Sequence, residues 1–105
     1  MRTYVEALSD FTDDVVCRRD DDGVYTNVPR RITHHSPDGF EWGYGGSGPA
    51  DFALNILSIF IGEKAARSGG LYQDFKWAFV SSLPEAGGTI PRKVILDWIE
   101  SKRAE

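Results

Sequence analysis

The sequence predicts a single α+β domain, in which a small antiparallel sheet near the N-terminus is followed by about three helices. The chain has 105 residues, which is the size of one independent core. An Asp-Gly pair at 22–23 lies between two short β-prone runs and predicts a hairpin. A nearly continuous apolar stretch at 50–61 follows a glycine-rich turn and predicts a central buried helix. We therefore treat residues 1–105 as one domain.

The predicted sheet comes from the first third of the chain. Residues 3–8 and 15–19 are short β-branched or apolar runs separated by a polar stretch, which indicates two strands, or one strand and an extended arm. Asp22-Gly23 then leads into a further run at 24–28, because glycine accepts the positive φ that a tight hairpin turn needs. Pro29 lacks a backbone donor, so this strand should end near Val28 or lie at a sheet edge.

The run at 40–44 alternates aromatic residues with Glu and Gly. In an extended strand, Phe40, Trp42 and Tyr44 would share one face, with Glu41 and Gly43 on the other. Such a stripe most often packs in a core, here against the helix that follows. The alternative is an exposed platform that stacks on bases or contacts a partner protein.

The central helix is predicted to begin near Pro49, since proline suits the first helical turn. Ser47 or Gly48 can cap it, and Asp51 complements the positive end of the helix dipole. The helix is apolar almost all round, which indicates burial on several sides, and Gly62 is predicted to end it.

Two further helices are expected after a polar connection at 63–70 that can contain a helical turn. Helical spacing of apolar residues predicts a helix over 71–83, which ends before Pro84. After a connection at 86–89, a third helix should run from about 91 to 101. The expected inner stripes are Leu71, Phe75, Ala78, Phe79 and Leu83 in the first of these helices, and Val94, Ile95, Trp98 and Ile99 in the second.

Charge and cysteine content exclude some classes of function. The chain has 12 Lys and Arg against 16 Asp and Glu, a net charge of −4, so its overall field repels nucleic-acid backbones. Cys17 is the single cysteine, which suits a reducing cytoplasm, and it is more often a small buried hydrophobe than a reactive thiol. The N-terminus lacks a signal-peptide pattern, and the apolar stretch at 52–61 is too short to span a bilayer. We expect a cytoplasmic protein with no membrane partner.

The turn formed by Gly45, Gly46, Ser47 and Gly48 is the strongest candidate for a ligand site. Small residues let backbone N–H groups approach an anion at a helix N-terminus, where the dipole also favours negative charge. The turn lacks the lysine of a phosphate-binding P-loop, and a sharp turn into a helix requires glycines with positive φ in any case. Ligand binding and backbone geometry therefore both remain open explanations.

The other polar clusters do not predict catalysis or metal binding. His34 and His35 lie near Ser36, Asp38 and Glu41, but adjacent histidines point apart in an extended chain, no triad order is evident, and the pair forms a poor zinc shell. We expect no catalytic residue, no metal and no cofactor.

The acidic run Asp20, Asp21 and Asp22 resembles the start of a calcium loop, but Arg31 stands where the twelfth, acidic ligand is required. The run is therefore more simply a solvated turn. Clustered acids can also imitate a nucleic-acid backbone and enter a basic groove on a partner, although Arg18, Arg19, Arg30 and Arg31 dilute this idea.

Residues 35–50 read HSPDGFEWGYGGSGPA, and an apolar helix follows them. This run resembles a family of small bacterial and phage domains of unknown function with the signature HSPxGFEWGYGGSGPAxLAL. Residues 71–77 and Leu83-Pro84 resemble a later motif of the same family, so the resemblance covers most of 23–100. Residues 2–16 have no match, and Phe52 stands where a smaller aliphatic residue is expected.

The resemblance implies no role for any particular residue. The family's occurrence in phages and mobile elements implies a small accessory protein that binds host machinery. An inhibitor of a nucleic-acid-targeting defence system, such as an anti-CRISPR protein, fits this description, but family membership alone does not define function.

The sequence therefore predicts a small acidic, non-enzymatic protein that binds a protein partner, possessing no direct affinity for nucleic acid. The candidate partner-binding residues are Asp20, Asp21, Asp22, Glu41, Trp42 and Tyr44. The alternative is a domain, with or without enzymatic activity, that binds an anionic or nucleotide-like ligand at the turn from Gly45 to Gly48. The oligomeric state does not follow from the sequence.

Overall fold

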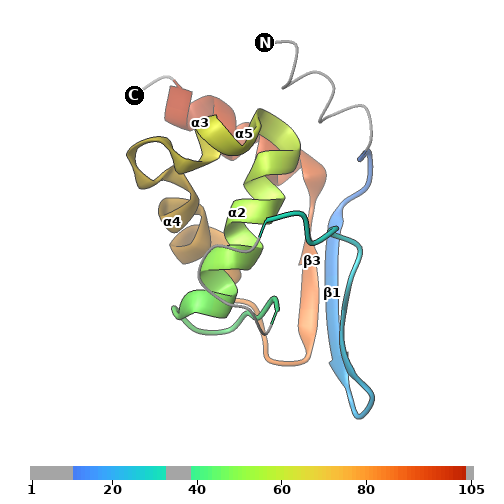
Figure 1. The fold of residues 1–105 in the computed structure, drawn as a ribbon. Coiled ribbons are helices and arrows are strands. Elements are labelled where there is room, and N and C mark those ends of the chain that lie inside the picture. Colours follow the sequence, from blue (N-terminus) through green and yellow to red (C-terminus); the bar gives the residue numbers. More distant parts are fainter. Residues whose placement is uncertain (1–10, 33–38, 104–105) are drawn as a thin grey trace.

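The computed structural model describes residues 11–32 and 39–103. It confirms the α+β prediction, with a three-stranded antiparallel sheet and helices packed to one side of it (Figure 1). The strands are β1 (Val15–Asp20), β2 (Gly23–Thr26) and β3 (Gly87–Ile90), arranged in the order β2-β1-β3. The strand predicted at 3–8 and the cluster of His34, His35, Ser36 and Asp38 lie outside the described residues.

Strands β1 and β2 form the predicted hairpin. Asp20 pairs with Gly23 across a tip made of Asp21 and Asp22, and the Asp22 N–H donates to the Asp20 carboxylate at 2.9 Å. On β1, Val15 and Cys17 are buried and face the helices. The expectation that Cys17 is a small buried hydrophobe is confirmed, and its burial raises the pKa of its thiol.

Strand β3 differs from the sequence prediction, which placed a connection at 86–89. It pairs antiparallel with β1, from Val15 opposite Ile90 to Arg18 opposite Gly87. Its sequence, Gly-Gly-Thr-Ile, has little local preference for a strand. Gly87 has a φ of 112°, and a Cβ there would overlap the backbone of Cys17. Close contact with β1 therefore requires this glycine, and tertiary pairing creates the strand.

Helix α2 (Ser47–Ile61) is the buried centre of the fold. It begins two residues before the predicted Pro49, and its N-cap is Gly46, whose backbone makes the cap without a side-chain hydrogen bond. The predicted capping role of Ser47 or Gly48 is therefore wrong. Asp51 lies beyond the first turn and is fully buried, so it does not complement the helix end as predicted. Gly62, with a φ of 83°, ends the helix as predicted.

The chain after α2 folds into α3 (Glu63–Arg67), a 3-10 turn η1 (Ser68–Gly70), α4 (Leu71–Phe75) and a π-helical turn η2 (Lys76–Val80). The predicted helix at 71–83 is thus divided, and the Ser81 N–H donates to the Lys76 carbonyl at 2.8 Å, five residues back. The wider turn rotates the side chains that follow, so Val80 is buried and Ala78, predicted to face inward, is exposed.

The last helix, α5 (Arg92–Arg103), is close to its predicted range. Ile95 and Ile99 are buried as expected, but Val94 is 41% exposed and does not belong to the inner stripe. Within residues 11–32 and 39–103, no helix has the length and apolar character needed to cross a membrane.

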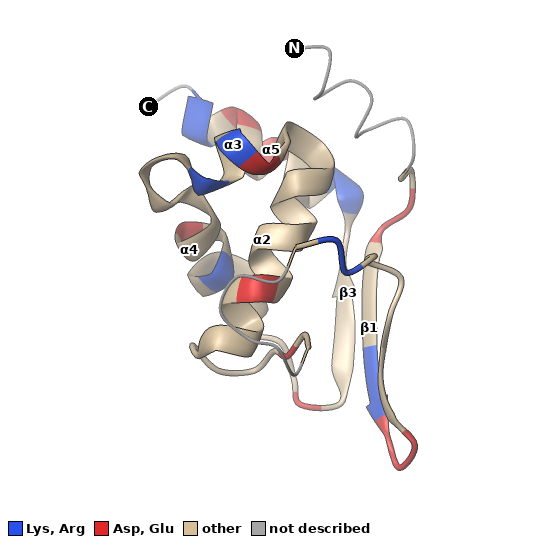
Figure 2. Ribbon diagram, in the orientation of Figure 1, with Lys and Arg blue, Asp and Glu red and all other residues tan. Residues whose placement is uncertain are grey.

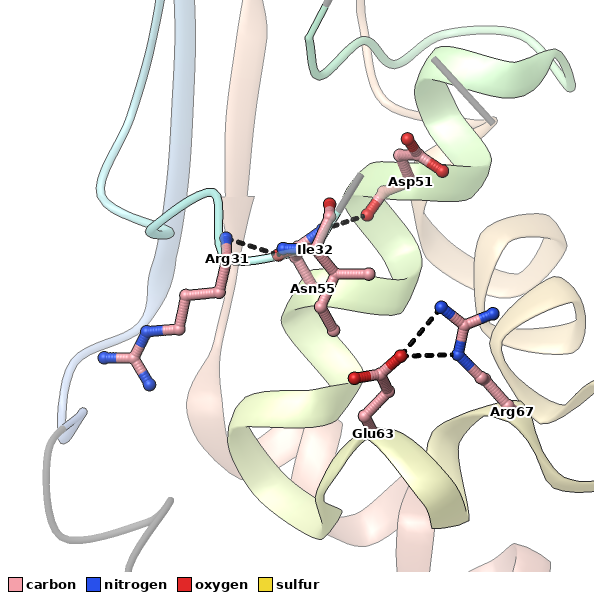
Figure 3. Close-up of polar contacts among 6 residues, drawn as sticks. All are labelled: Arg31, Ile32, Asp51, Asn55, Glu63 and Arg67. Atoms are coloured by element: carbon pink, nitrogen blue, oxygen red, sulfur yellow. Dashed lines mark hydrogen bonds and ion pairs between the residues drawn. The ribbon is translucent and has the colours of Figure 1, made fainter. Parts of the chain in front are cut away.

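Asn55 is a buried polar residue in the middle of α2, and it connects this helix to the segment that follows the hairpin (Figure 3). Its Oδ1 accepts the N–H groups of Arg31 at 2.9 Å and Ile32 at 3.0 Å. Its Nδ2 donates to the carbonyls of Ile32 at 2.9 Å and Asp51 at 2.8 Å. The amide therefore holds the backbone of Arg31 against α2, while the Arg31 side chain points away from Asn55.

Candidate functional site

The aromatic run at 40–44 is not a strand, and its three rings do not share a face as predicted. Phe40 and Trp42 are buried and pack on Phe52 of α2, with ring centroids 5.0 and 5.8 Å away. Core packing against the following helix is therefore confirmed for these two residues. Tyr44, however, is 52% exposed. Gly43, with a φ of 87°, turns the chain between them, and its N–H donates to the Val80 carbonyl at 3.0 Å.

Glu41 and Trp42, both predicted to contact a partner, make contacts within the chain. The Arg19 guanidinium donates to both carboxylate oxygens of Glu41, at 2.6 and 3.2 Å, and lies 4.8 Å from the centre of the Trp42 ring. Arg19 Nε and Trp42 Nε1 both donate to the Glu85 carbonyl at 3.0 Å. The hydrogen bonds from Arg19 lower the pKa of Glu41. This network joins β1 to the loops before α2 and β3.

The glycines at 45–48 are packed under side chains of this chain. A Cβ on Gly45 would overlap the Trp77 ring, and one on Gly46 would lie 2.5 Å from the Tyr44 ring. A Cβ on Gly48 would lie 2.8 Å from the Glu41 Cβ. None of these three glycines has a positive φ, so close contact with side chains, rather than the predicted left-handed backbone, explains them. Two aromatic rings and the stem of a carboxylate therefore lie against these glycines.

Tyr44 and Trp77 form the most prominent exposed aromatic feature near this turn. Their side chains are 52% and 62% exposed, and their rings rest on the backbone of Gly46 and Gly45, respectively. We call the two rings, with the glycine backbone beneath them, the aromatic surface. Both rings are held in place on one side and open to solvent on the other.

Lys76 connects the aromatic surface to η2. It is 6% exposed, its Nζ donates to the Gly45 carbonyl at 3.0 Å, and the same Nζ lies 4.4 Å from the centre of the Trp77 ring. The π-helical turn thus holds the glycine backbone through Lys76 and positions Trp77 above it. π-helical turns are rare and are frequently found at functional sites.

Trp77 is not among the site residues that the sequence predicted. One signal was present, because Trp77 lies outside the apolar stripe predicted for 71–83, and a tryptophan on the outer face of a helix is unusual. Ser47, from the predicted ligand-binding set, is exposed at the start of α2.

The acidic residues Asp20, Asp21 and Asp22 form the exposed tip of the hairpin, as expected for a solvated turn (Figure 2). The Asp20 carboxylate also pairs with Arg18 at 3.7 Å on the surface. The three acidic side chains are accessible to a partner. In the described part of the chain, no group of three or more His, Cys, Asp and Glu residues could hold a metal ion.

The fold and this surface define a small α+β domain with an exposed aromatic pair on a glycine-rich turn. The chain belongs to a family of unknown function, DUF6166, whose family model matches residues 7–101. Comparison with curated proteins gives no match, and comparison with solved structures gives none either. Roles for individual residues therefore come from their geometry alone.

Proposed function

We propose that this protein is a non-enzymatic protein-binding module and that the aromatic surface is its main contact. The observation that carries the proposal is the pairing of exposure with fixed position at Tyr44 and Trp77. Tyrosine and tryptophan are the residues most enriched among those that dominate binding energy in protein interfaces. Rings that are already held on a backbone lose little conformational freedom when a partner covers them.

The glycine backbone contributes to this proposal because it holds the rings. Gly45 and Gly46 have no side chains that would displace Trp77 and Tyr44, so each ring packs directly on the turn. Lys76 further supports the ring of Trp77 through its contact with the π face.

The family resemblance adds a more specific proposal about the partner. An inhibitor of a host nucleic-acid-targeting defence complex would dock on a basic, nucleic-acid-binding surface. The exposed acids Asp20, Asp21 and Asp22 would steer the chain toward such a surface, since clustered opposite charge accelerates association. Anion binding at 45–48 is less well supported, because the glycine-rich turn at the start of α2 is the single feature behind it.

The test is an affinity capture from a lysate of the source cells, with and without nuclease, followed by mass spectrometry. Three baits are compared: the wild-type chain, Trp77→Ala, and Tyr25→Ala as a matched control. Tyr25 is 50% exposed, close to the value for Tyr44, but it lies on the hairpin. Circular dichroism confirms that each bait is folded.

The expected result is a nuclease-resistant protein, captured in stoichiometric amount by the wild type and Tyr25→Ala but lost with Trp77→Ala. With the purified partner, Trp77→Ala should weaken binding by about 2 kcal/mol or more, which is roughly 30-fold in Kd. Equal capture by all three baits would reject the aromatic surface as the contact. An empty capture with the wild type would reject the binding module itself.

A further inference from the structure

A pocket of about 280 Å³ lies where the last turn of α5 meets the connection between α3 and α4. Its floor is aliphatic and is formed by Ile61, Ala65, Leu71 and Ile99. Ile61 and Ile99 are 9% and 3% exposed, so they belong to the core as well as to the pocket. The pocket therefore opens from the core to the surface of the helical layer, on the side away from the sheet (Figure 1).

The turn η1 shapes one wall of this pocket. Gly69 and Gly70 have φ values of 61° and 73°, which residues with side chains rarely adopt, so both glycines are needed where the chain leaves α3 and enters α4. Ala65 before this turn and Leu71 after it both line the pocket. Alanine is the smallest side chain in the wall, so a larger residue at 65 would fill part of the space.

The rim of the pocket is basic. Lys102 and Arg103 follow Ile99 by three and four residues, so the three side chains share one face of α5, and all of them line the pocket. No acidic residue within 11–32 and 39–103 lines it. On the neighbouring α3, Glu63 pairs with Arg67 at 2.7 Å, which balances its charge (Figure 3). The pocket thus combines an aliphatic floor with a positive rim.

We propose that this pocket binds a fatty acid of short to medium chain length, with the aliphatic chain on the floor and the carboxylate at Lys102 and Arg103. The ligand matches both halves of the pocket, since burial of the chain is favourable and the carboxylate meets positive charge. The volume lies just below the range of pockets for drug-sized ligands, which suits one chain better than a nucleotide or a ring cofactor.

A simpler role for the two cations is to complement the negative end of the α5 dipole. That role explains basic residues in the last turn, but it does not explain an aliphatic pocket beside them. The Lys102 ammonium also lies 5.4 Å from the centre of the Trp98 ring, so this side chain has a defined position along the helix. The two roles differ in their consequences for binding, which makes them separable by experiment.

The experiment titrates the full chain with octanoate, decanoate and octan-1-ol, each up to about 1 mM, by calorimetry and by amide chemical shifts. Ala65→Phe fills the pocket, and Ala78→Phe is its control at an exposed alanine of η2. Lys102→Gln with Arg103→Gln removes the charges of the rim. Arg18→Gln with Lys93→Gln removes two cations elsewhere, whose side chains are 62% and 85% exposed.

Both carboxylates should shift the amide signals of the residues that line the pocket, and decanoate should bind at least about threefold more tightly than octanoate because it buries a longer chain. Ala65→Phe should weaken decanoate binding at least about tenfold, whereas Ala78→Phe should not. The double glutamine variant at the rim should weaken octanoate binding about fivefold or more and leave octan-1-ol unchanged, because the alcohol carries no charge. The control pair should bind both probes like the wild type.

The proposal is overturned if decanoate shifts no signal at the pocket. It is also overturned if octan-1-ol binds as tightly as octanoate, or if the rim variant keeps the wild-type affinity for octanoate, since the rim would then not recognise a carboxylate. Circular dichroism identifies any variant that fails to fold, and the shift map and the rim variant still decide if Ala65→Phe does so. Trp77→Ala should bind decanoate like the wild type, so this test is independent of the aromatic surface.

Discussion

Trp42 and Tyr44 are two residues apart in one aromatic run, yet they lie in opposite environments. Trp42 is 2% exposed, packs on Phe52 and donates a hydrogen bond to Glu85. Tyr44 is 52% exposed and rests on the backbone of Gly46. Gly43 turns the chain between them. Alternating residues share a face only while the chain stays extended. Gly43 therefore divides this run into a buried half, with Trp42, and an exposed half, with Tyr44.

The largest loss of stability should come from Trp42→Ala, in the buried half of the run. Removing this buried ring should lower the free energy of unfolding by about 3–5 kcal/mol, through lost packing and a cavity next to Phe52. Trp77→Ala, at a position that is 62% exposed, should cost less than about 1 kcal/mol. Urea denaturation of both variants measures the difference, and similar losses would contradict the assignment of Trp77 to the surface.

A smaller effect is expected from Gly45→Ala, which tests how the rings are held. The new methyl group would overlap the Trp77 ring, so the ring must move, at a cost of about 1–3 kcal/mol. In a Trp77→Ala background the same substitution should cost less than about 0.5 kcal/mol, because the obstacle is gone. A double-mutant cycle in urea measures this coupling, and additive effects would show that the ring does not rest on Gly45.

The smallest effect concerns Glu41, which precedes Trp42 and pairs with Arg19. The hydrogen bonds from Arg19 lower the pKa of Glu41 in the folded state, so the pair stabilises the fold above the ordinary glutamate pKa. This stability is lost as the pH falls through the lowered pKa. Because the Glu41 side chain is 34% exposed, solvent screening limits the expected effect of Glu41→Gln to about 1 kcal/mol at neutral pH.

Unfolding measured from pH 7 to pH 3 checks this prediction, because the wild type and Glu41→Gln should converge at the acidic end. Asp97→Asn is the matched control, since Asp97 pairs with Lys93 on the surface of α5 and should contribute about 0.3–0.5 kcal/mol. A gap between wild type and Glu41→Gln that persists at low pH would mean that the carboxylate charge is not its source.

Local signals in the sequence predicted much of the fold. Asp22-Gly23 predicted the hairpin, the apolar run predicted α2, and Gly62 predicted where that helix ends. Each of these signals depends on residues near one another in the chain. Strand β3 had no such signal, because its Gly-Gly-Thr-Ile sequence becomes a strand only through pairing with β1.

The candidate site was predicted only in part. The sequence predicted the turn at 45–48 as a ligand site, and Tyr44 as a residue that contacts a partner from an aromatic face shared with Phe40 and Trp42. Trp77 was missed, because a regular helix over 71–83 gives it no reason to meet Gly45, some thirty residues earlier in the sequence. The π-helical turn at η2 creates this contact, and its wider hydrogen bond depends on packing around it.

The sequence by itself determined the α+β class, the hairpin, the buried central helix and the importance of the glycine-rich turn. These follow from periodicity, turn chemistry and composition, which act over a few residues. Only the tertiary structure decided that Trp42 is core, that Glu41 pairs with Arg19, and that Trp77 and Tyr44 are exposed together. The physical reason is that burial and pairing depend on which distant segments meet, as the ring of Trp77 meets the backbone of Gly45.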